Sequence, residues 1–477
     1  MLTSWLSTWW RKERRRSVSP RRTARLPYRT RLQVESLEDR CLMSNAYLVT
    51  NLVSDQPGVA KIQDTNLVNS WGLDAAPGGP WWVADNGTGV STLYDGNTGQ
   101  PIPLVVNIPL ADGSPSAPTG LVFNGTGQFA VSEDGRSGSA FFIFATEDGT
   151  ISGWNPFVDL THAVLAVDNS ASGAVYKGLA LGNNASGNFL YATNFHAGSI
   201  DVFDSSFHAV SLSGSFTDPN LPSGYAPFGI RNINGNLYVT YALQDADKHD
   251  DVAGPAHGFV DIFDTNGNLE RRLITHGHLD SPWGLAVAPA DFGDFSNALL
   301  IGNFGNGRIN AYDPNTGAFL GVLSTRPGRP IVIDGLWALS FGNGSLGGPT
   351  NALFFTSGPD DESHGLFGDV TVNPAGFGGG APHGSSRTAA QLNALANAAS
   401  TFSFNVGQPP SITSGNGSTP GADHGASQNQ TGVALLSLGE VGAAQMPGGT
   451  FHPPGTNGDQ GTVLDGGLTK NPFGSGQ

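Results

Sequence analysis

One motif recurs six times between Trp71 and Val372, and this repeat constrains the fold more than any other feature of the chain. Each copy begins with a short apolar strand, continues through a second strand and an Asn-, Asp- or Gly-containing turn, and ends in a third strand that carries an aromatic residue. The Gly or Ala that follows each strand start recurs at intervals of 48 to 58 residues. These marker residues are Gly72, Gly120, Gly178, Gly229, Gly284 and Ala338. A period of this size that is built from short strands predicts an all-β fold, a six-bladed β-propeller.

The composition agrees with this prediction. The 477 residues include 67 Gly and 31 Pro, and only 13% of them are charged, which is typical of a turn-rich β protein with low-complexity ends. The sixth copy lacks a convincing fourth strand, whereas an unassigned strand precedes the first copy at residues 46–53. We therefore expect the N-terminal strand to complete the sixth blade and to close the ring, which removes a sheet edge.

Three segments follow from the change in composition along the chain. Residues 1–45 are basic and are expected to be a disordered leader, residues 46–372 form the propeller, and residues 373–477 are a Gly/Ser/Asn-rich tail. The tail cannot bury enough apolar surface to offset the entropy of ordering it, so we expect it to be disordered. No stretch approaches the roughly 18 apolar residues of a membrane span, so no such span is expected.

The charge of the chain is divided unevenly. Residues 1–40 contain 11 of the 23 basic residues and 4 of the 39 acidic residues, so the remainder carries a net charge of −23. An acidic body repels nucleic acid, and it suits a small molecule, a glycan or a protein as the partner at the propeller face. The single cysteine, Cys41, allows no intramolecular disulfide. We expect a monomer.

Polar residues concentrate in the loops of one propeller face. In a four-stranded blade with strands a to d, the b–c and d–a loops emerge on the same face, around the central channel. The segment Glu133–Arg136 is assigned to the b–c loop of the second blade. The candidate ligand-binding residues of this face are Asp85, Asn86, Asn194, His196, Asn303, Arg308 and Asp334. For the repeated Asn residues the alternative is a turn-forming role, in which the amide bonds backbone N–H groups of its own loop.

Three tryptophans recur at the start of strand a, at Trp71, Trp283 and Trp337. One interpretation is that they pack between the blades. The other is that they form a platform on which a sugar stacks.

Two acidic loops, 245–257 and 360–364, provide the candidate metal ligands. Carboxylates that are held close together are costly unless a cation, a proton or an Arg relieves them. Oxygen ligands suit Ca²⁺, and added histidines suit Zn²⁺, so one of these divalent cations is the expected cofactor. The candidate ligands are Asp245, Asp247, His249, Asp360, Glu362 and His364. The alternative is that these are solvated loop residues, since their spacing matches no formal metal motif.

Three functions remain open because propellers serve all of them. The first is ligand binding on the b–c/d–a face without catalysis. The second is a metal-assisted hydrolase or lyase that acts on a sugar, lactone or ester, with catalytic residues unknown. The third is a non-catalytic scaffold for protein interaction. No Gly-x-Ser-x-Gly motif occurs, so a serine triad has no support.

The blade pattern, together with segments 244–255, 302–313 and 358–368, resembles a family of uncharacterised bacterial exported six-bladed propellers with NHL- and lactonase-like blades. This resemblance implies the fold and export but no reaction. The Arg-rich N-terminus that ends in Glu-Ser-Leu-Glu-Asp-Arg at residues 35–40 resembles the export leader of planctomycete proteins. It implies an extracellular or cell-surface location.

Overall fold

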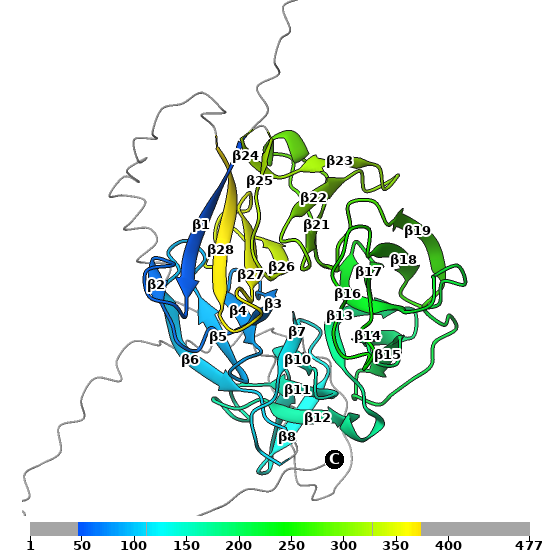
Figure 1. Cartoon of the computed structure of the whole chain (residues 1–477). Coiled ribbons are helices and arrows are strands. Elements are labelled where there is room, and N and C mark those ends of the chain that lie inside the picture. The colour runs from blue at the N-terminus through cyan, green and yellow to red at the C-terminus, as the bar shows by residue number, and fades with distance from the viewer. Residues whose placement is uncertain (1–45, 111, 327, 374–477) are drawn as a thin grey trace, which may run out of the picture. The chain divides into compact units, whose positions relative to one another are not determined.

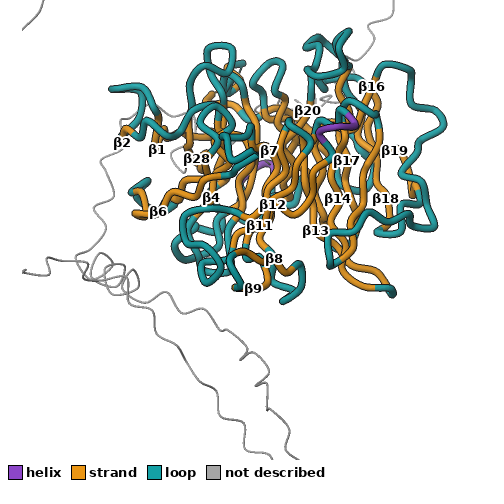
Figure 2. The backbone as a smooth tube through the Cα atoms, turned by 90° about the horizontal axis from the view of Figure 1, so that it is seen from below, coloured by secondary structure: helices purple, strands orange, loops and turns teal. Residues whose placement is uncertain are grey.

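The computed structural model describes residues 46–110, 112–326 and 328–373. The expected leader at residues 1–45 lies outside the described residues, and so does the expected tail except for Asn373, which ends the last strand. Six sheets surround a central axis as the blades of a propeller, which confirms the predicted fold class (Figure 1). Seen from the side, the strands run between two faces of loops (Figure 2).

The strands of each blade follow one another outward from the axis. Blade one contains β3 (Ser70–Asp74), β4 (Trp81–Asp85), β5 (Val90–Tyr94) and β6 (Pro101–Asn107). Blade two contains β7 (Pro118–Phe123), β10 (Phe142–Thr146), β11 (Thr150–Trp154) and β12 (Val164–Asp168). Blade three contains β13 (Tyr176–Asn184), β14 (Gly187–Asn194) and β15 (Ser199–Asp204). Blade four contains β16 (Tyr225–Ile233), β17 (Asn236–Leu243), β18 (Phe259–Asp264) and β19 (Leu269–Thr275). Blade five contains β20 (Pro282–Val287), β21 (Leu299–Asn303), β22 (Ile309–Tyr312) and β23 (Phe319–Val322).

Blade six is built from both ends of the described chain, as predicted. It contains β26 (Leu336–Phe341), β27 (Leu353–Ser357), β28 (Leu366–Asn373) and β1 (Ala46–Ser54), and the short β2 (Ile62–Gln63) pairs with the outer side of β1. Strand β1 runs antiparallel to β28, from Ala46 opposite Asn373 to Ser54 opposite Leu366. The ring is therefore closed by hydrogen bonds between segments about 320 residues apart in the sequence.

The described chain also contains short hairpins and 3₁₀ turns in addition to the blade strands. Two hairpins, β8 (Ala130–Glu133) with β9 (Arg136–Ser139) and β24 (Ser324–Arg326) with β25 (Arg329–Pro330), lie outside the six sheets. Two short 3₁₀ turns, η1 (Ser170–Ser172) and η2 (Gly293–Phe295), connect strands. In the part of the chain that the structure describes, no helix is long and apolar enough to cross a membrane.

The marker glycines are required by the crowding of the innermost strands. A Cβ at Gly120 would lie 2.5 Å from the backbone nitrogen of Leu179 in the next blade, and a Cβ at Gly284 would lie 2.5 Å from the carbonyl oxygen of Trp337. Real Cβ atoms do not approach other atoms so closely. In all six blades the strand pairing is also irregular at or next to the marker. The glycine that recurs in the sequence therefore marks the position where the backbones of neighbouring blades are in contact.

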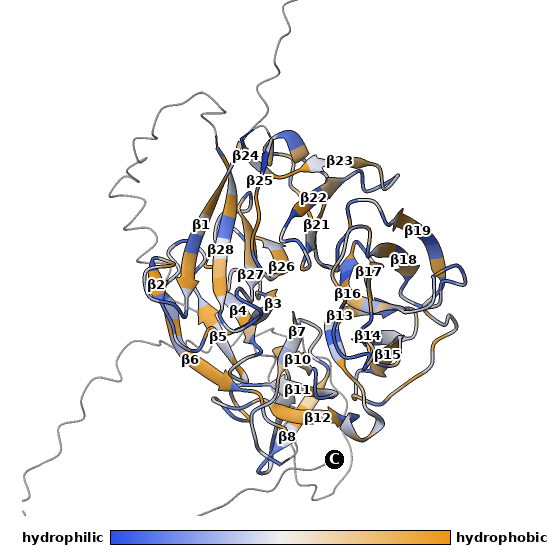
Figure 3. Cartoon of the chain, viewed as in Figure 1, coloured by the Kyte–Doolittle hydropathy of each residue, from blue (hydrophilic) through white to orange (hydrophobic). Residues whose placement is uncertain are grey.

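Apolar side chains fill the space between neighbouring blades. Trp82 of blade one stacks on Phe142 of blade two, with ring centroids 4.1 Å apart, and Tyr94 stacks on Phe367 of blade six at 5.5 Å. Figure 3 shows long hydrophobic stretches on strands such as β6 and β12, whereas hydrophilic residues occur on both strands and loops. Burial of such aromatic faces supplies the main attraction between blades.

Two details differ from the prediction. Segment Glu133–Arg136 is not a b–c loop, because it forms the tip of the β8–β9 hairpin, which is inserted between strands a and b of blade two. Ala130 and Ser132 are exposed, so this strand cannot pack between blades, and the fully buried β10 takes that place. In blade three the expected fourth strand near 209–212 is reduced to one bridge between Phe203 and Ala209.

Removal of β1 should open the propeller. We expect a chain that starts at Asp55 to melt on the order of 10 °C below a chain that starts at Ala46, and less cooperatively, because β28 loses its partner and exposes an edge. Circular dichroism melting of the two truncated chains measures the difference. Identical melting curves would show that β1 does not close the ring.

Candidate functional site

An aromatic cluster lies at the axis, where the innermost strands begin on the b–c/d–a face. The residue before the marker is Trp71, Phe228, Trp283 and Trp337 in four of the blades. Trp71 and Trp337 stack with ring centroids 3.5 Å apart, and each is only 1% exposed. These two rings therefore pack in the core and offer no platform for a sugar. Phe195 and Phe304 complete the aromatic cluster.

In blade three the same repeat position holds Lys177. Its side chain is 2% exposed, and its ammonium group forms ion pairs with Glu147 and with Asp250, at 3.1 Å from Asp250 Oδ1. Its Nζ also lies 5.1 Å from the centre of the Trp71 ring. Burial acts to lower the pKa of Lys177, but the two carboxylates outweigh it and the pKa is raised. A permanently charged ammonium therefore lies beside the aromatic cluster.

Amides connect this ion pair to a third carboxylate. Asn86 Nδ2 donates to Glu147 Oε2 at 2.8 Å, and Asn69 Nδ2 donates to Asn86 Oδ1 at 3.1 Å and to Glu362 Oε2 at 2.7 Å. Asn69 Oδ1 in turn accepts from Trp337 Nε1 at 3.2 Å. Loops of blades one, two, four and six thus meet around Lys177 of blade three. We call the group Asn69, Asn86, Glu147, Lys177, His249, Asp250 and Glu362 the mouth network.

Two carboxyl groups near Lys177 have strongly perturbed acidity. Burial raises the pKa of Glu362 to about 7, with a further contribution from the negative charge of Glu147 and an opposing one from the Asn69 hydrogen bond. Burial likewise raises the pKa of Asp251 to about 6. At neutral pH the mouth network therefore contains a carboxyl group that both accepts and releases a proton.

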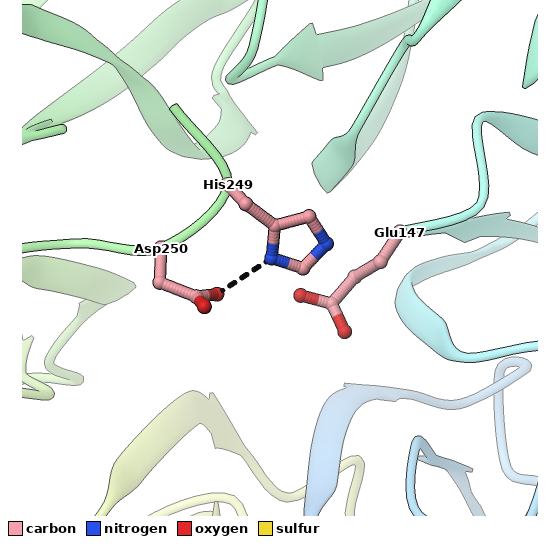
Figure 4. Close-up of side chains that lie close together, drawn as sticks. All are labelled: Glu147, His249 and Asp250. Atoms are coloured by element: carbon pink, nitrogen blue, oxygen red, sulfur yellow. Dashed lines mark hydrogen bonds and ion pairs between the residues drawn. The ribbon is translucent and has the colours of Figure 1, made fainter. Parts of the chain in front are cut away.

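Three side chains of the mouth network lie close enough together to ligate one metal ion. Glu147, His249 and Asp250 each offer an atom that lies within 4.8 Å of the others (Figure 4). His249 Nδ1 is 2.9 Å from Asp250 Oδ1, and the side chains of His249 and Asp250 are 47% and 66% exposed. Lys177 already engages the carboxylates of Glu147 and Asp250, so a cation bound here would share them with the ammonium group.

The predicted metal ligands of the first acidic loop are separated by the fold. His249 belongs to the mouth network. Asp245 Oδ1 instead accepts the backbone N–H of His249 at 2.9 Å and so holds the turn of the loop, whereas Asp247 is exposed. The carboxylate that the loop contributes to the network is Asp250.

In the second acidic loop only one of the predicted ligands reaches the mouth network, and this is Glu362. Asp360 is exposed, and its backbone N–H donates to Asp334 Oδ2 at 3.0 Å. His364 Nδ1 lies 2.7 Å from Asp55 Oδ2, on the loop after β1. Among the described residues, the six predicted ligands do not form one cluster.

Of the predicted ligand-binding amides, Asn86 lies in the mouth network and the other two stabilise their own surroundings. Asn194 Oδ1 accepts the backbone N–H of Ala197 at 3.2 Å. Asn303 is fully buried and donates to the carbonyl oxygen of His278 at 2.8 Å. The Asn194 contact corresponds to the turn-forming alternative, whereas Asn303 bonds the d–a loop that precedes its blade.

The remaining predicted face residues lie outside the mouth network. Asp85 is fully buried, and its carboxylate accepts from Thr92 Oγ1 at 2.7 Å, while burial raises its pKa well above the usual range. His196 is half-buried on its loop, and Arg308 and Asp334 are exposed.

Two central residues of the mouth network, Glu147 and Lys177, were not predicted as site residues from the sequence. Lys177 could have been found because it replaces an aromatic residue at one position of the repeat. Glu147 was hidden by the β8–β9 insertion, since the true b–c loop of blade two is the short turn between β10 and β11.

Replacing Glu362 by Gln should stabilise the protein more at pH 7 than at pH 5. The folded wild type keeps the Glu362 proton up to a pKa of about 7, whereas the unfolded chain loses it near the ordinary value of 4.5. The contribution of Glu362 to the free energy of unfolding therefore falls as the pH rises through this window. Gln does not titrate, so the variant lacks this fall. We expect the stability difference to change on the order of 1 kcal/mol, measured by urea unfolding at several pH values. The exposed neighbour Asp361 provides the control Asp361→Asn, and an equal change in both variants would contradict the expectation.

The proteins most similar to this chain in sequence include two uncharacterised viral proteins. No family model matches the chain. One uncharacterised protein of Acanthamoeba polyphaga mimivirus is 33% identical over 329 residues, which cover 68% of this chain and 79% of that protein. A second uncharacterised protein of the same virus is 32% identical over 329 residues, with coverage of 68% and 85%. A solved structure, virginiamycin B lyase from Staphylococcus aureus, is 15% identical with a TM-score of 0.40, covering 69% of this chain and all of that one. The chain belongs to the family of these two uncharacterised mimivirus proteins.

Proposed function

We propose that this protein is a ligand-binding propeller and that its ligand sits on the mouth network of the b–c/d–a face. The observation that supports this most is the convergence of polar side chains from four blades around the buried ammonium of Lys177 in a fifth. Three carboxylates held near one another are unfavourable for folding alone, and perturbed acidity in such a place is typical of functional sites.

The chemistry of the mouth network favours a ligand that donates hydrogen bonds. The groups most open to solvent are the carboxylate of Asp250 and the ring of His249, and both can accept. The acidic charge of the chain beyond residue 40 disfavours anionic ligands. A neutral glycan meets both conditions, because its hydroxyl groups donate to carboxylates and it carries no charge.

A divalent cation is the second candidate occupant, alone or together with the glycan. Its support is the approach of Glu147, His249 and Asp250 within 4.8 Å of one another. Carboxylate oxygens with one imidazole nitrogen suit Ca²⁺ or Zn²⁺. The cation would have to overcome repulsion from Lys177, which shares two of these carboxylates.

Binding of the full chain to an array of neutral glycans tests the proposal, followed by calorimetry with the glycan that binds. We expect Asp250→Asn and Glu362→Gln to weaken binding about tenfold or more, since each replaces a carboxyl group of the mouth network by an uncharged amide. The matched controls are Asp247→Asn and Asp361→Asn, which alter exposed carboxylates of the same two loops. Calorimetry with CaCl₂ and ZnCl₂ on the same variants tests the cation. Absence of binding to any glycan and to either cation, or equal loss in the controls, would contradict the proposal.

We also propose that the chain is exported by a bacterium to the cell surface or beyond it. The support is the resemblance of the Arg-rich N-terminus to planctomycete export leaders, whereas the viral relatives carry no evidence on this point. Expression in a planctomycete of the full chain and of a chain without residues 1–45 tests it. We expect only the full chain in the surface and medium fractions. Equal distribution of the two chains would contradict export through this leader.

A further inference from the structure

A cavity of about 350 Å³ lies at the other end of the central channel from the mouth network. It is enclosed by the innermost strands β3, β7, β13, β16, β20 and β26, and most of its lining runs from the marker residues to the third residue beyond them. It therefore opens toward the a–b loops. Trp283 of the aromatic cluster also lines it, so this cluster separates the cavity from the mouth network.

The wall of this cavity is an aliphatic ring. The residue after each marker faces it, and these six residues are Leu73, Leu121, Leu179, Ile230, Leu285 and Leu339. Two charged residues interrupt the apolar wall, Asp74 from blade one and Arg231 from blade four. Each occupies the second position after its marker, where the other blades carry Val, Ala or Ser. Blades one and four lie opposite each other in a ring of six.

Both charges are held in place by neighbouring groups. Arg231 Nη1 donates to the carbonyl oxygen of Leu339 at 2.9 Å, and Nη2 donates to Ser340 Oγ at 3.0 Å. Asp74 accepts from the backbone N–H groups of Ala75 and Phe123, at 2.9 and 2.8 Å. A guanidinium group has five N–H donors and a carboxylate has about four acceptor sites, so each retains unused capacity.

The two charges do not satisfy each other directly. No ion pair within 4.0 Å joins Asp74 to Arg231 among the ion pairs of the described residues. The two charges nevertheless interact. Burial raises the pKa of Asp74, and the positive charge of Arg231 opposes this rise. Two opposite charges that are partly desolvated and not paired carry a desolvation cost, and a ligand with complementary charges would reduce it.

We propose that this cavity binds a small zwitterion, with its carboxylate at Arg231, its ammonium at Asp74 and a hydrocarbon middle against the aliphatic ring. The volume is at the lower end of the range for small-molecule sites. The planar guanidinium group matches a carboxylate in geometry. A simple acid would be repelled by Asp74 and a simple amine by Arg231, whereas a zwitterion satisfies both. This site shares no residue with the mouth network, so its test does not depend on the proposed function.

A series of ω-amino acids tests this proposal, because their length measures the separation of the two charges. Calorimetry on the full chain uses γ-aminobutyrate, ε-aminocaproate and ω-aminocaprylate, with caproate and hexylamine as the singly charged controls. We expect one member of the series to bind about tenfold or more tightly than either control. Binding by no member of the series, or equal affinity for the amino acid and its controls, would overturn the proposal and leave a water-filled channel end.

Two variants assign the charges. Asp74→Asn should reverse the preference, so that caproate binds at least as well as ε-aminocaproate, and Arg231→Gln should do the same for hexylamine. A reversal of preference cannot result from loss of folding, which would abolish all binding. Asp361→Asn on the opposite face is the control and should leave the series unchanged. If both cavity variants keep the wild-type preference, the ligand does not lie between these residues.

Discussion

The close approach of the six innermost strands is the constraint on which the rest of the structure depends. At the marker position the backbone of one blade occupies the space that a side chain would need, so glycine stands there in five blades. This contact sets the register of every strand a relative to the axis. In five blades the residue before the marker belongs to the aromatic cluster or the mouth network, and in all six the residue after it faces the cavity. One steric requirement thus places both candidate sites.

Lys177 shows how a small departure from the repeat creates a site. At the position where four other blades carry an aromatic ring, blade three buries an ammonium group that requires negative partners. Glu147 and Asp250 supply them from the neighbouring blades, and the amides of Asn69 and Asn86 extend the contact to Glu362. Asp250 both pairs with the buried Lys177 and is exposed to solvent, so the contact between blades and the proposed binding site share this residue.

The fold could be predicted from the sequence because the repeat, the missing strand of blade six and the extra strand at residues 46–53 are all local patterns. The b–c loop of blade two could not, because the β8–β9 hairpin alternates like an inner strand and only burial distinguishes it from β10. The same limit affected the candidate site. The acidic loops were recognised from composition, but side-chain direction decided that Glu362 and His249 point to the network while His364 turns to Asp55.

The sequence by itself determined the number of blades, the closure of the ring and the face on which polar loops gather, since these follow from periodicity and turn chemistry. Only the tertiary structure decided which charges meet. Lys177, Glu147 and Asp250 are separated by 30 and 73 residues and come from three blades, so no spacing along the chain relates them. Asp74 and Arg231 are likewise brought to one cavity by the circular order of the blades. Closure of the ring brings residues that are far apart in the sequence next to one another, and a pattern along the chain does not contain this information.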